Sequence, residues 1–252
     1  IVQFPYLSDN YGVLLHDNYT QQTVAIDAGD DKAYNEALDR EGWGLSQIWV
    51  THHHWDHTDG INALYKHWQC EVIGPAKHST TPIAHLSTGL EAGDTFQFAD
   101  VPVEILHTPG HTLDMINYYL PSENIFFAGD TLFSLGCGRV FEGDMDMMCR
   151  SMNKILELPD ETMIYCSHEY TQANGKFALS VEADNQFLIS RINEVEELIK
   201  EGKPTIPTNL RIEKQANPFL RTSSLALKKK LGLENSSAAQ VFAALRAAKD
   251  NF

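Results

Sequence analysis

Five of the seven residues from Thr51 to His57 are of types that ligate metal ions; the run reads Thr-His-His-His-Trp-Asp-His. In extended backbone, side chains two residues apart point the same way, so His52 and His54 can bind one ion while His53 points away. Asp56 and His57 fall at the start of an expected helix and can face a neighbouring ion. Imidazole and carboxylate ligands together suit zinc, iron or manganese.

Three further candidate ligands, His111, Asp130 and His168, each follow an apolar, strand-like run. If these strands lie side by side, their ends meet at one rim of a sheet, where binding loops belong. The combined set exceeds one tetrahedral site but suits two divalent ions if Asp130 bridges them. The expected ligands are His52, His54, Asp56, His57, His111, Asp130 and His168. The alternative reading is a solvated His-rich loop plus buried core histidines, which the interleaved aspartate argues against.

Asp27 ends the strand-like run 23–26 and is a candidate hydrogen-bond partner for a metal-bound imidazole. Metal-bound imidazoles usually donate their other N–H to a carboxylate or a carbonyl. The alternative is a carboxylate that only caps the turn before Gly29. The remaining histidines are assigned to structure or surface: His16, His53, His67, His78, His85 and His107.

The patterns up to about residue 169 alternate between strands and helices, which predicts an α/β (α+β) domain with helices covering sheets. Strands are expected at 11–17, 23–28, 47–51, 101–106, 116–120, 124–128 and 162–166. Helices are expected at 31–40, 57–68 and 145–157.

From about residue 170 the strand signals stop. Helical spacing recurs at 177–181, 187–200, 223–231 and 237–249. We therefore expect a catalytic domain over residues 1–169 and a helical C-terminal domain over residues 170–252.

The net charge of −15 argues against a nucleic-acid ligand, because phosphate contacts require a basic surface. No apolar run is long enough for a membrane span, and no secretory signal is visible. The four cysteines form no C-x-x-C pair and are expected to be reduced thiols. These features predict a cytoplasmic, monomeric protein that binds neither nucleic acid nor membrane.

The metal motif T-H-x-H-x-D-H, with the later histidines and the aspartate, resembles the metallo-β-lactamase-fold signature, and the resemblance narrows to glyoxalase II (hydroxyacylglutathione hydrolase). Sequence segments typical of that family extend over nearly the whole chain. They are Cys137-Gly-Arg-Val-Phe-Glu-Gly143, His168-Glu-Tyr-Thr171, Asn217-Pro-Phe-Leu-Arg221 and the closing Leu245–Phe252. The resemblance implies a four-layer αβ/βα sandwich with a helical C-terminal domain that completes a glutathione site.

The resemblance also implies the substrate contacts: Arg139, Phe141, Tyr170, Arg246 and Lys249. Glutathione carries two carboxylates, so an acidic protein needs placed cations to hold it. For Arg246 and Lys249, spacing alone would favour a solvated helix face.

Two positions depart from the family pattern. Phe141 stands where many members have Tyr, which removes one hydroxyl. After His111 many members continue T-x-G-H, whereas this chain reads Thr112-Leu-Asp-Met115, so local packing there is expected to differ.

The implied reaction is hydrolysis of S-D-lactoylglutathione to D-lactate and glutathione, the second step of methylglyoxal detoxification. A hydroxide held by two metal ions attacks the thioester carbonyl. The expected metal is zinc, with iron or manganese as alternatives. Asp56 and Asp130 are the expected catalytic side chains.

Four alternatives remain open. A glutathione-persulfide dioxygenase with one iron shares the H-x-H-x-D-H run, but the helical C-terminal segment disfavours it. A non-catalytic metal- or glutathione-binding module would be expected to lack part of the ligand set. A secreted β-lactamase and an RNA-processing nuclease conflict with the extra helices and with the charge, respectively.

Overall fold

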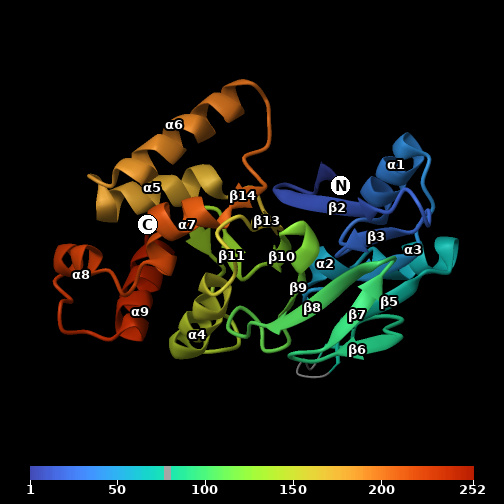
Figure 1. Ribbon diagram of the computed structural model, residues 1–252, viewed down its shortest axis with the longest axis horizontal. Helices are drawn as coiled ribbons and strands as arrows, with labels where there is room; N and C mark the ends of the chain where they lie inside the picture. Colours follow the sequence, from blue (N-terminus) through green and yellow to red (C-terminus); the bar gives the residue numbers. More distant parts are fainter. Residues whose placement is uncertain (77–80) are drawn as a thin grey trace. The chain divides into compact units, whose positions relative to one another are not determined.

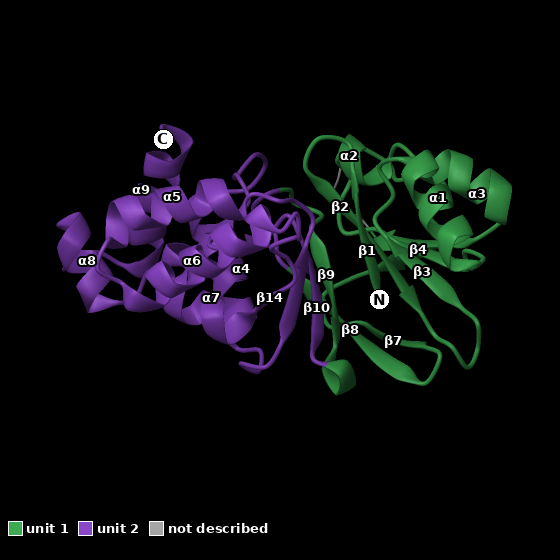
Figure 2. Ribbon diagram, turned by 90° about the horizontal axis from the view of Figure 1, so that it is seen from above, with its two compact units in different colours: residues 1–107, 112–123 green, residues 108–111, 124–252 purple. Residues whose placement is uncertain are grey.

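The computed structural model describes residues 1–76 and 81–252; His78, assigned above to structure or surface, lies outside the described residues. Figure 2 shows the two compact units of the chain. Unit 1 comprises residues 1–107 and 112–123, and unit 2 comprises residues 108–111 and 124–252. The expected boundary after residue 169 divides the chain differently and stays a prediction.

Unit 1 contains a six-stranded mixed sheet in the order β1-β2-β3-β4-β5-β6. The pairs β1-β2 and β2-β3 are antiparallel, and the pairs from β3 to β6 are parallel. The strands are β1 (Val2–Tyr6), β2 (Asn10–His16), β3 (Thr23–Ile26), β4 (Gln47–Trp49), β5 (Glu71–Pro75) and β6 (Thr88–Leu90). The three strands expected before residue 52 are confirmed, with ends shifted by one or two residues. The patterns missed β1, β5 and β6.

Helices α1 (Asp31–Glu41) and α3 (Ile61–Trp68) pack against this sheet (Figure 1). Tyr34 and Leu38 of α1 and Leu64 of α3 share one buried apolar cluster with Leu14 and Ile48 of the sheet. Burial of this apolar face is the main stabilising term for such a layer.

The single helix expected at 57–68 is interrupted at Gly60, leaving a short α2 (Trp55–Thr58) before α3. The N–H of Gly60 donates to the carbonyl of Ala28 at 2.8 Å. A Cβ at Gly60 would lie 2.6 Å from the backbone N of Asp31, so only glycine allows this close approach. The interruption makes α2 a separate turn that carries the Asp-His end of the metal motif.

Unit 1 also contains the antiparallel strands β7 (Thr95–Phe98), β8 (Val101–His107) and β9 (Ile116–Leu120), followed by the short 3₁₀ helix η1 (Pro121–Glu123). Trp49 of β4 is fully buried and stacks on Tyr118 with 5.1 Å between ring centroids. The rings of Phe96 and Phe98 meet Trp49 edge-on. These four aromatic rings pack β4 against β7 and β9 within the unit.

Unit 2 begins its regular structure with β10 (Ile125–Gly129), which pairs in parallel with β13 (Met163–Cys166). The hairpin of β11 (Leu132–Phe133) and β12 (Gly136–Cys137) follows β10, and α4 (Met145–Leu156) precedes β13. The expected strands at 124–128 and 162–166 and the expected helix at 145–157 are confirmed.

The C-terminal region of unit 2 is mainly helical, as expected. The helices expected at 187–200, 223–231 and 237–249 are confirmed to within two residues, whereas the pattern at 177–181 covered only part of the helix Thr171–Glu182. The elements are α5 (Thr171–Glu182), α6 (Gln186–Lys200), β14 (Thr208–Asn209), α7 (Leu210–Ala216), η2 (Pro218–Leu220), α8 (Leu225–Leu231) and α9 (Ala238–Asp250). The expectation that strands stop at about residue 170 is wrong for β14, which pairs antiparallel with β13. A two-residue strand is too short to show an alternating pattern. Helix α7 was also missed.

All four cysteines are buried and free, which confirms the expected thiols. Within residues 1–76 and 81–252, no helix is both long and apolar enough to span a membrane.

The carboxylate of Glu213 on α7 is fully buried in unit 2 and organises the hairpin β11-β12. Its Oε1 accepts from the hydroxyls of Ser134 and Thr208, at 3.0 and 2.7 Å. Its Oε2 accepts from the N–H of Leu135 at 2.8 Å and from the amide of Asn217 at 3.0 Å. Burial raises the pKa of Glu213 above its ordinary value, against the opposing effect of these four donors.

We expect Glu213→Gln to remove a pH-dependent part of the stability. Because the folded state raises the pKa of Glu213, it holds the proton more tightly than the unfolded state does. The contribution to stability is therefore full below the unfolded pKa, about 4.3, and falls as pH rises through the folded pKa. Gln fits this site because its NH2 group can donate to the Ser134 and Thr208 hydroxyls, which can also accept. Its oxygen then accepts from the Leu135 N–H and the Asn217 amide.

The measurement is urea unfolding of wild type and variant across pH 4 to 8. The stability difference, wild type minus Glu213→Gln, should fall as pH rises, with metal-ligand titrations cancelling. Glu213→Leu, which strands the Leu135 N–H and the Asn217 amide, should cost about 3 kcal/mol or more. A pH-independent difference for Glu213→Gln would contradict the raised pKa.

Candidate metal centre

In unit 1 the loop after β4 carries His52 and His54. The side chain of His52 is fully buried, and its Nε2 lies 3.0 Å from Nδ1 of His54. Helix α2 begins immediately afterwards, with His54 as its extended N-cap residue. Two ring nitrogens thus converge on one point, as the two-residue spacing predicts.

The next pair, Asp56 and His57, lies on α2, with Asp56 Oδ2 at 3.4 Å from His57 Nε2. Asp56 is held by two groups from β1 and β2. The amide of Asn10 donates to Asp56 Oδ2 at 3.0 Å, and the hydroxyl of Tyr6 donates to the Asp56 carbonyl at 2.8 Å. Neither contact was predicted, since a single Asn or Tyr in a strand gives no signal.

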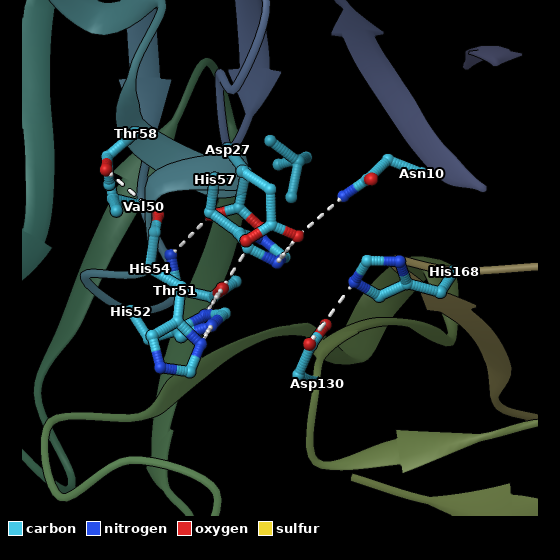
Figure 3. A network of polar contacts seen from close by, with 12 residues as sticks. Asn10, Asp27, Val50, Thr51, His52, His54, His57, Thr58, Asp130 and His168 are labelled. Atoms are coloured by element: carbon cyan, nitrogen blue, oxygen red, sulfur yellow. Dashed lines mark hydrogen bonds and ion pairs between the residues drawn. The ribbon is translucent and has the colours of Figure 1, made fainter. Parts of the chain in front are cut away.

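Asp27 supports the same loop from the end of β3, as the contacts drawn in Figure 3 show. Its Oδ2 lies 2.8 Å from His57 Nδ1 and accepts from the Thr51 hydroxyl at 3.0 Å; its Oδ1 accepts from the Thr51 N–H at 2.7 Å. The backbone at Asp27 has φ 57, a left-handed conformation that is costly for a residue other than glycine. The three hydrogen bonds offset this strain.

In unit 2 two imidazoles converge on one carboxylate oxygen, that of Asp130. Nε2 of His111 and Nε2 of His168 lie 3.4 and 3.3 Å from Oδ2 of Asp130. All three are at least nine-tenths buried. Asp130 follows β10, His168 follows β13, and the ring of His168 stacks on Tyr170 with 4.9 Å between centroids. A carboxylate between two imidazoles is the geometry expected of a shared ligand.

The hydrogen-bond partners fix which ring nitrogen presents a lone pair. A carboxylate or carbonyl oxygen can only accept, so His57 Nδ1 carries a proton toward Asp27 and His111 Nδ1 carries one toward the Arg139 carbonyl at 2.8 Å. The Thr51 hydroxyl donates to Asp27, so it accepts from His52 Nδ1 at 3.0 Å. Each of the three rings keeps Nε2 for a cation.

This donor set fits divalent metal ions. Within unit 1, the ligand atoms of His52 and His54, and those of Asp56 and His57, lie within 4.8 Å of one another. Zinc sites usually contain buried imidazoles next to carboxylates. In each imidazole Nδ1–H donates to a protein oxygen, and Nε2 presents a lone pair to the ion.

Three of the expected glutathione contacts surround Asp250 on unit 2. Arg139 is exposed and its Nε lies 4.0 Å from Asp250 Oδ1. Lys249 donates to the carbonyl of Ala173 at 3.3 Å and lies over the rings of Phe177 and Phe252. Burial, and then the charges of Arg246 and Arg139, lower the pKa of Lys249. Three cations against one carboxylate leave a local positive patch on an acidic protein, which suits an anionic ligand.

Arg246 lies deeper than its expected role suggests, with a side chain 5% exposed. Its guanidinium donates to the carbonyl of Cys137 at 3.0 Å and to Asp250 Oδ1, and it lies over the ring of Phe219. It therefore holds the start of the loop 137–143. Direct contact of Arg246 with glutathione stays a prediction, as it does for Arg139, Tyr170, Lys249 and the exposed Phe141.

The fold and these His and Asp groups define a protein of the metallo-β-lactamase superfamily, whose sequence profile matches residues 13–168. Solved structures support this fold. A B3 metallo-β-lactamase, BLEG-1, has a TM-score of 0.66 at 22% identity over 87% of this chain and 98% of its own. ETHE1 from Myxococcus xanthus has a TM-score of 0.65 at 24% identity over 98% of this chain and 97% of its own. At these identities the likeness concerns the fold alone.

Sequence relatives narrow the assignment. Residues 169–252 match the profile of the hydroxyacylglutathione hydrolase C-terminus. The chain is 44% identical to the hydroxyacylglutathione hydrolase of Ruegeria pomeroyi, over all of this chain and 98% of the relative. It is 47% identical to that of Rhodopseudomonas palustris, over 98% of this chain and 96% of the relative. The chain belongs to the hydroxyacylglutathione hydrolase family, also called glyoxalase II, of thioester hydrolases, and the expected metallo-β-lactamase fold with its helical C-terminal region is confirmed.

We expect Asp27→Gly to lower zinc affinity about 10- to 100-fold, because it removes the acceptor that fixes the His57 ring. Glycine tolerates the left-handed backbone, so the effect reports the lost carboxylate rather than strain. Asp27→Asn retains an acceptor oxygen, so its zinc affinity should lie between those of wild type and Asp27→Gly. Affinity is measured by competition with a chromophoric chelator, with the exposed Asp39→Ala on α1 as control. Equal zinc affinity in wild type and Asp27→Gly would show that Asp27 plays no part in the site.

Proposed function

We propose that the protein hydrolyses S-D-lactoylglutathione to D-lactate and glutathione. The observation that carries this proposal is the loop 137–143. Its Arg139 carbonyl accepts from the ligand His111, while its Cys137 carbonyl accepts from Arg246 beside the positive patch. One short segment thus contacts both a metal-ligand imidazole and the cations that suit the carboxylates of glutathione.

We propose that the seven His and Asp side chains hold two divalent ions, with Asp130 shared between them. Its Oδ2, facing both His111 and His168, supports this assignment. Zinc suits the donor set, and iron or manganese would be accepted by the same ligands. When bound, two such ions supply Lewis acidity, which lowers the pKa of water and polarises a carbonyl.

The protein's own groups then act by holding and orienting. Asp56, whose Oδ2 accepts from the amide of Asn10, is proposed to orient the attacking water. Asp27 and Thr51 keep His57 and His52 in the metal-binding tautomer. Glutathione leaves as a thiolate, a good leaving group, so no side chain is needed to donate a proton to it.

Lys249 and Arg139 are proposed to bind the carboxylates of the glutathione moiety, with Tyr170 and Phe141 lining the same region. Tyr170 is partly exposed and stacked on His168. Phe141 is 61% exposed, and its ring lies 5.2 Å from that of His111. Phe141 offers an apolar face without the hydroxyl that a tyrosine would supply.

The alternatives are less well supported. The match of residues 169–252 to the hydroxyacylglutathione hydrolase C-terminus favours the thioester over a persulfide substrate. The full-length match to a hydroxyacylglutathione hydrolase, at 44% identity, favours an enzyme over a non-catalytic binding module. We propose a monomer, with a cytoplasmic location.

The decisive experiment is hydrolysis of lactoylglutathione by the zinc-loaded protein, with Lys249→Ala as the variant. Loss of a charge-assisted contact to glutathione should lower kcat/KM about tenfold, mainly through KM. Lys229→Ala, an exposed lysine on α8, is the matched control and should leave KM unchanged. Absence of hydrolysis by metal-loaded wild type would refute the proposed activity, and an unchanged KM for Lys249→Ala would remove its binding role.

A further inference from the structure

The histidine at the centre of the metal motif is engaged by an aspartate from another segment of unit 1. Nδ1 of His53 lies 2.9 Å from Oδ1 of Asp114, and the two side chains are 9% and 1% exposed. Asp114 lies in the turn 112–115, which precedes β9 (Ile116–Leu120). The turn therefore makes a buried contact with the metal-binding loop.

One backbone contact and one side-chain contact hold this turn in place. The N–H of Ile116 donates to the carbonyl of Thr51 at 2.9 Å, and Nε2 of His107 donates to the carbonyl of Leu113 at 2.9 Å. Asp114 is therefore held at a set distance from the His52–His54 segment. Its second oxygen, Oδ2, is buried without a hydrogen-bond partner among the described residues. A buried carboxylate with so few donors depends heavily on each one, so His53 and Asp114 constrain each other.

Three consecutive imidazoles present a register problem. His53 has the same ligand chemistry as its neighbours, and a rotation of the loop by one residue would turn His53 toward an ion and His52 and His54 away. A hydrogen bond that keeps Nδ1 of His53 on Asp114 opposes that rotation.

We propose that Asp114 is a positioning residue that withholds His53 from the metal ions and so fixes the ligand register at His52 and His54. The inference rests on the proposed metal-dependent function. Without the Asp114 carboxylate, His53 competes with His52 and His54 for the metal ions, so the site binds metal in a mixture of arrangements.

The test is a set of four variants of the full chain: Asp114→Ala and Asp114→Gly, each alone and combined with His53→Ala. Each is titrated with Zn²⁺ against a chelator and with Co²⁺ while its visible ligand-field spectrum is recorded. Either single substitution should lower Zn²⁺ affinity about tenfold and alter the Co²⁺ spectrum. Adding His53→Ala removes the competing imidazole, so the double variants should recover a Zn²⁺ affinity within about twofold of wild type. They should also recover the wild-type Co²⁺ spectrum.

Asp114→Asn, whose oxygen can still accept from His53, should retain the wild-type Co²⁺ spectrum, and it provides a measurable variant if the smaller side chains do not fold. Asp146→Ala on the exposed face of α4 is the control. Wild-type affinity and spectrum in the single variants would overturn the proposal, as would a defect that His53→Ala fails to rescue, since a purely structural role predicts no rescue. Wild-type protein that binds no Zn²⁺ would instead refute the proposed function and this inference with it.

Discussion

A metal-binding histidine must present a lone pair at one ring nitrogen, and this requirement governs much of the structure. His52, His57 and His111 each meet it by directing Nδ1 to an oxygen of the protein. The oxygens belong to a hydroxyl, a carboxylate and a backbone carbonyl, so three different local structures reach the same result. Asp27 is central in unit 1, because its two oxygens serve both the His57 ring and the backbone of Thr51. Its left-handed backbone is the strain that accompanies this arrangement.

Unit 2 meets a different requirement, that of holding an irregular loop in place. The segment 131–143 connects Asp130, a proposed metal ligand, to the basic patch, and most of it lies outside regular structure. Buried polar groups on the helical region hold it: Glu213 accepts from Ser134 and Leu135, and Asn217 donates to the carbonyls of Phe133 and Gly136. Arg246 adds the contact to Cys137. Fully paired buried polar groups specify one conformation, because each loses its partners if the loop moves.

The sequence predicted the family, the position of the expected ligand residues after strand ends, and most of the long helices. Those signals are local, since side-chain period and residue type at a strand end are read directly from the chain. The supporting contacts could not be read in this way. Asn10 reaches Asp56 across 46 positions, and Glu213 reaches Ser134 across 79, so nothing in the local pattern marks them. Strand β14, with two residues, is too short to be recognised.

The family motif marked Arg246 as a glutathione contact, and that role stays a prediction. The structure adds contacts that the motif did not predict, because the buried guanidinium donates to the Cys137 carbonyl and pairs with Asp250. Asp114 was noted in the sequence only as a departure from the family pattern, and the structure adds its contact with His53.

The central claim is that Asp130 is shared by two metal ions held by His and Asp side chains. X-ray absorption and elemental analysis of the zinc-loaded protein test it most directly. The account predicts two zinc ions per chain with a zinc–zinc distance of about 3.5–4 Å, and loss of both signals in Asp130→Asn. One zinc ion per chain in wild type, or two retained in Asp130→Asn, would contradict it.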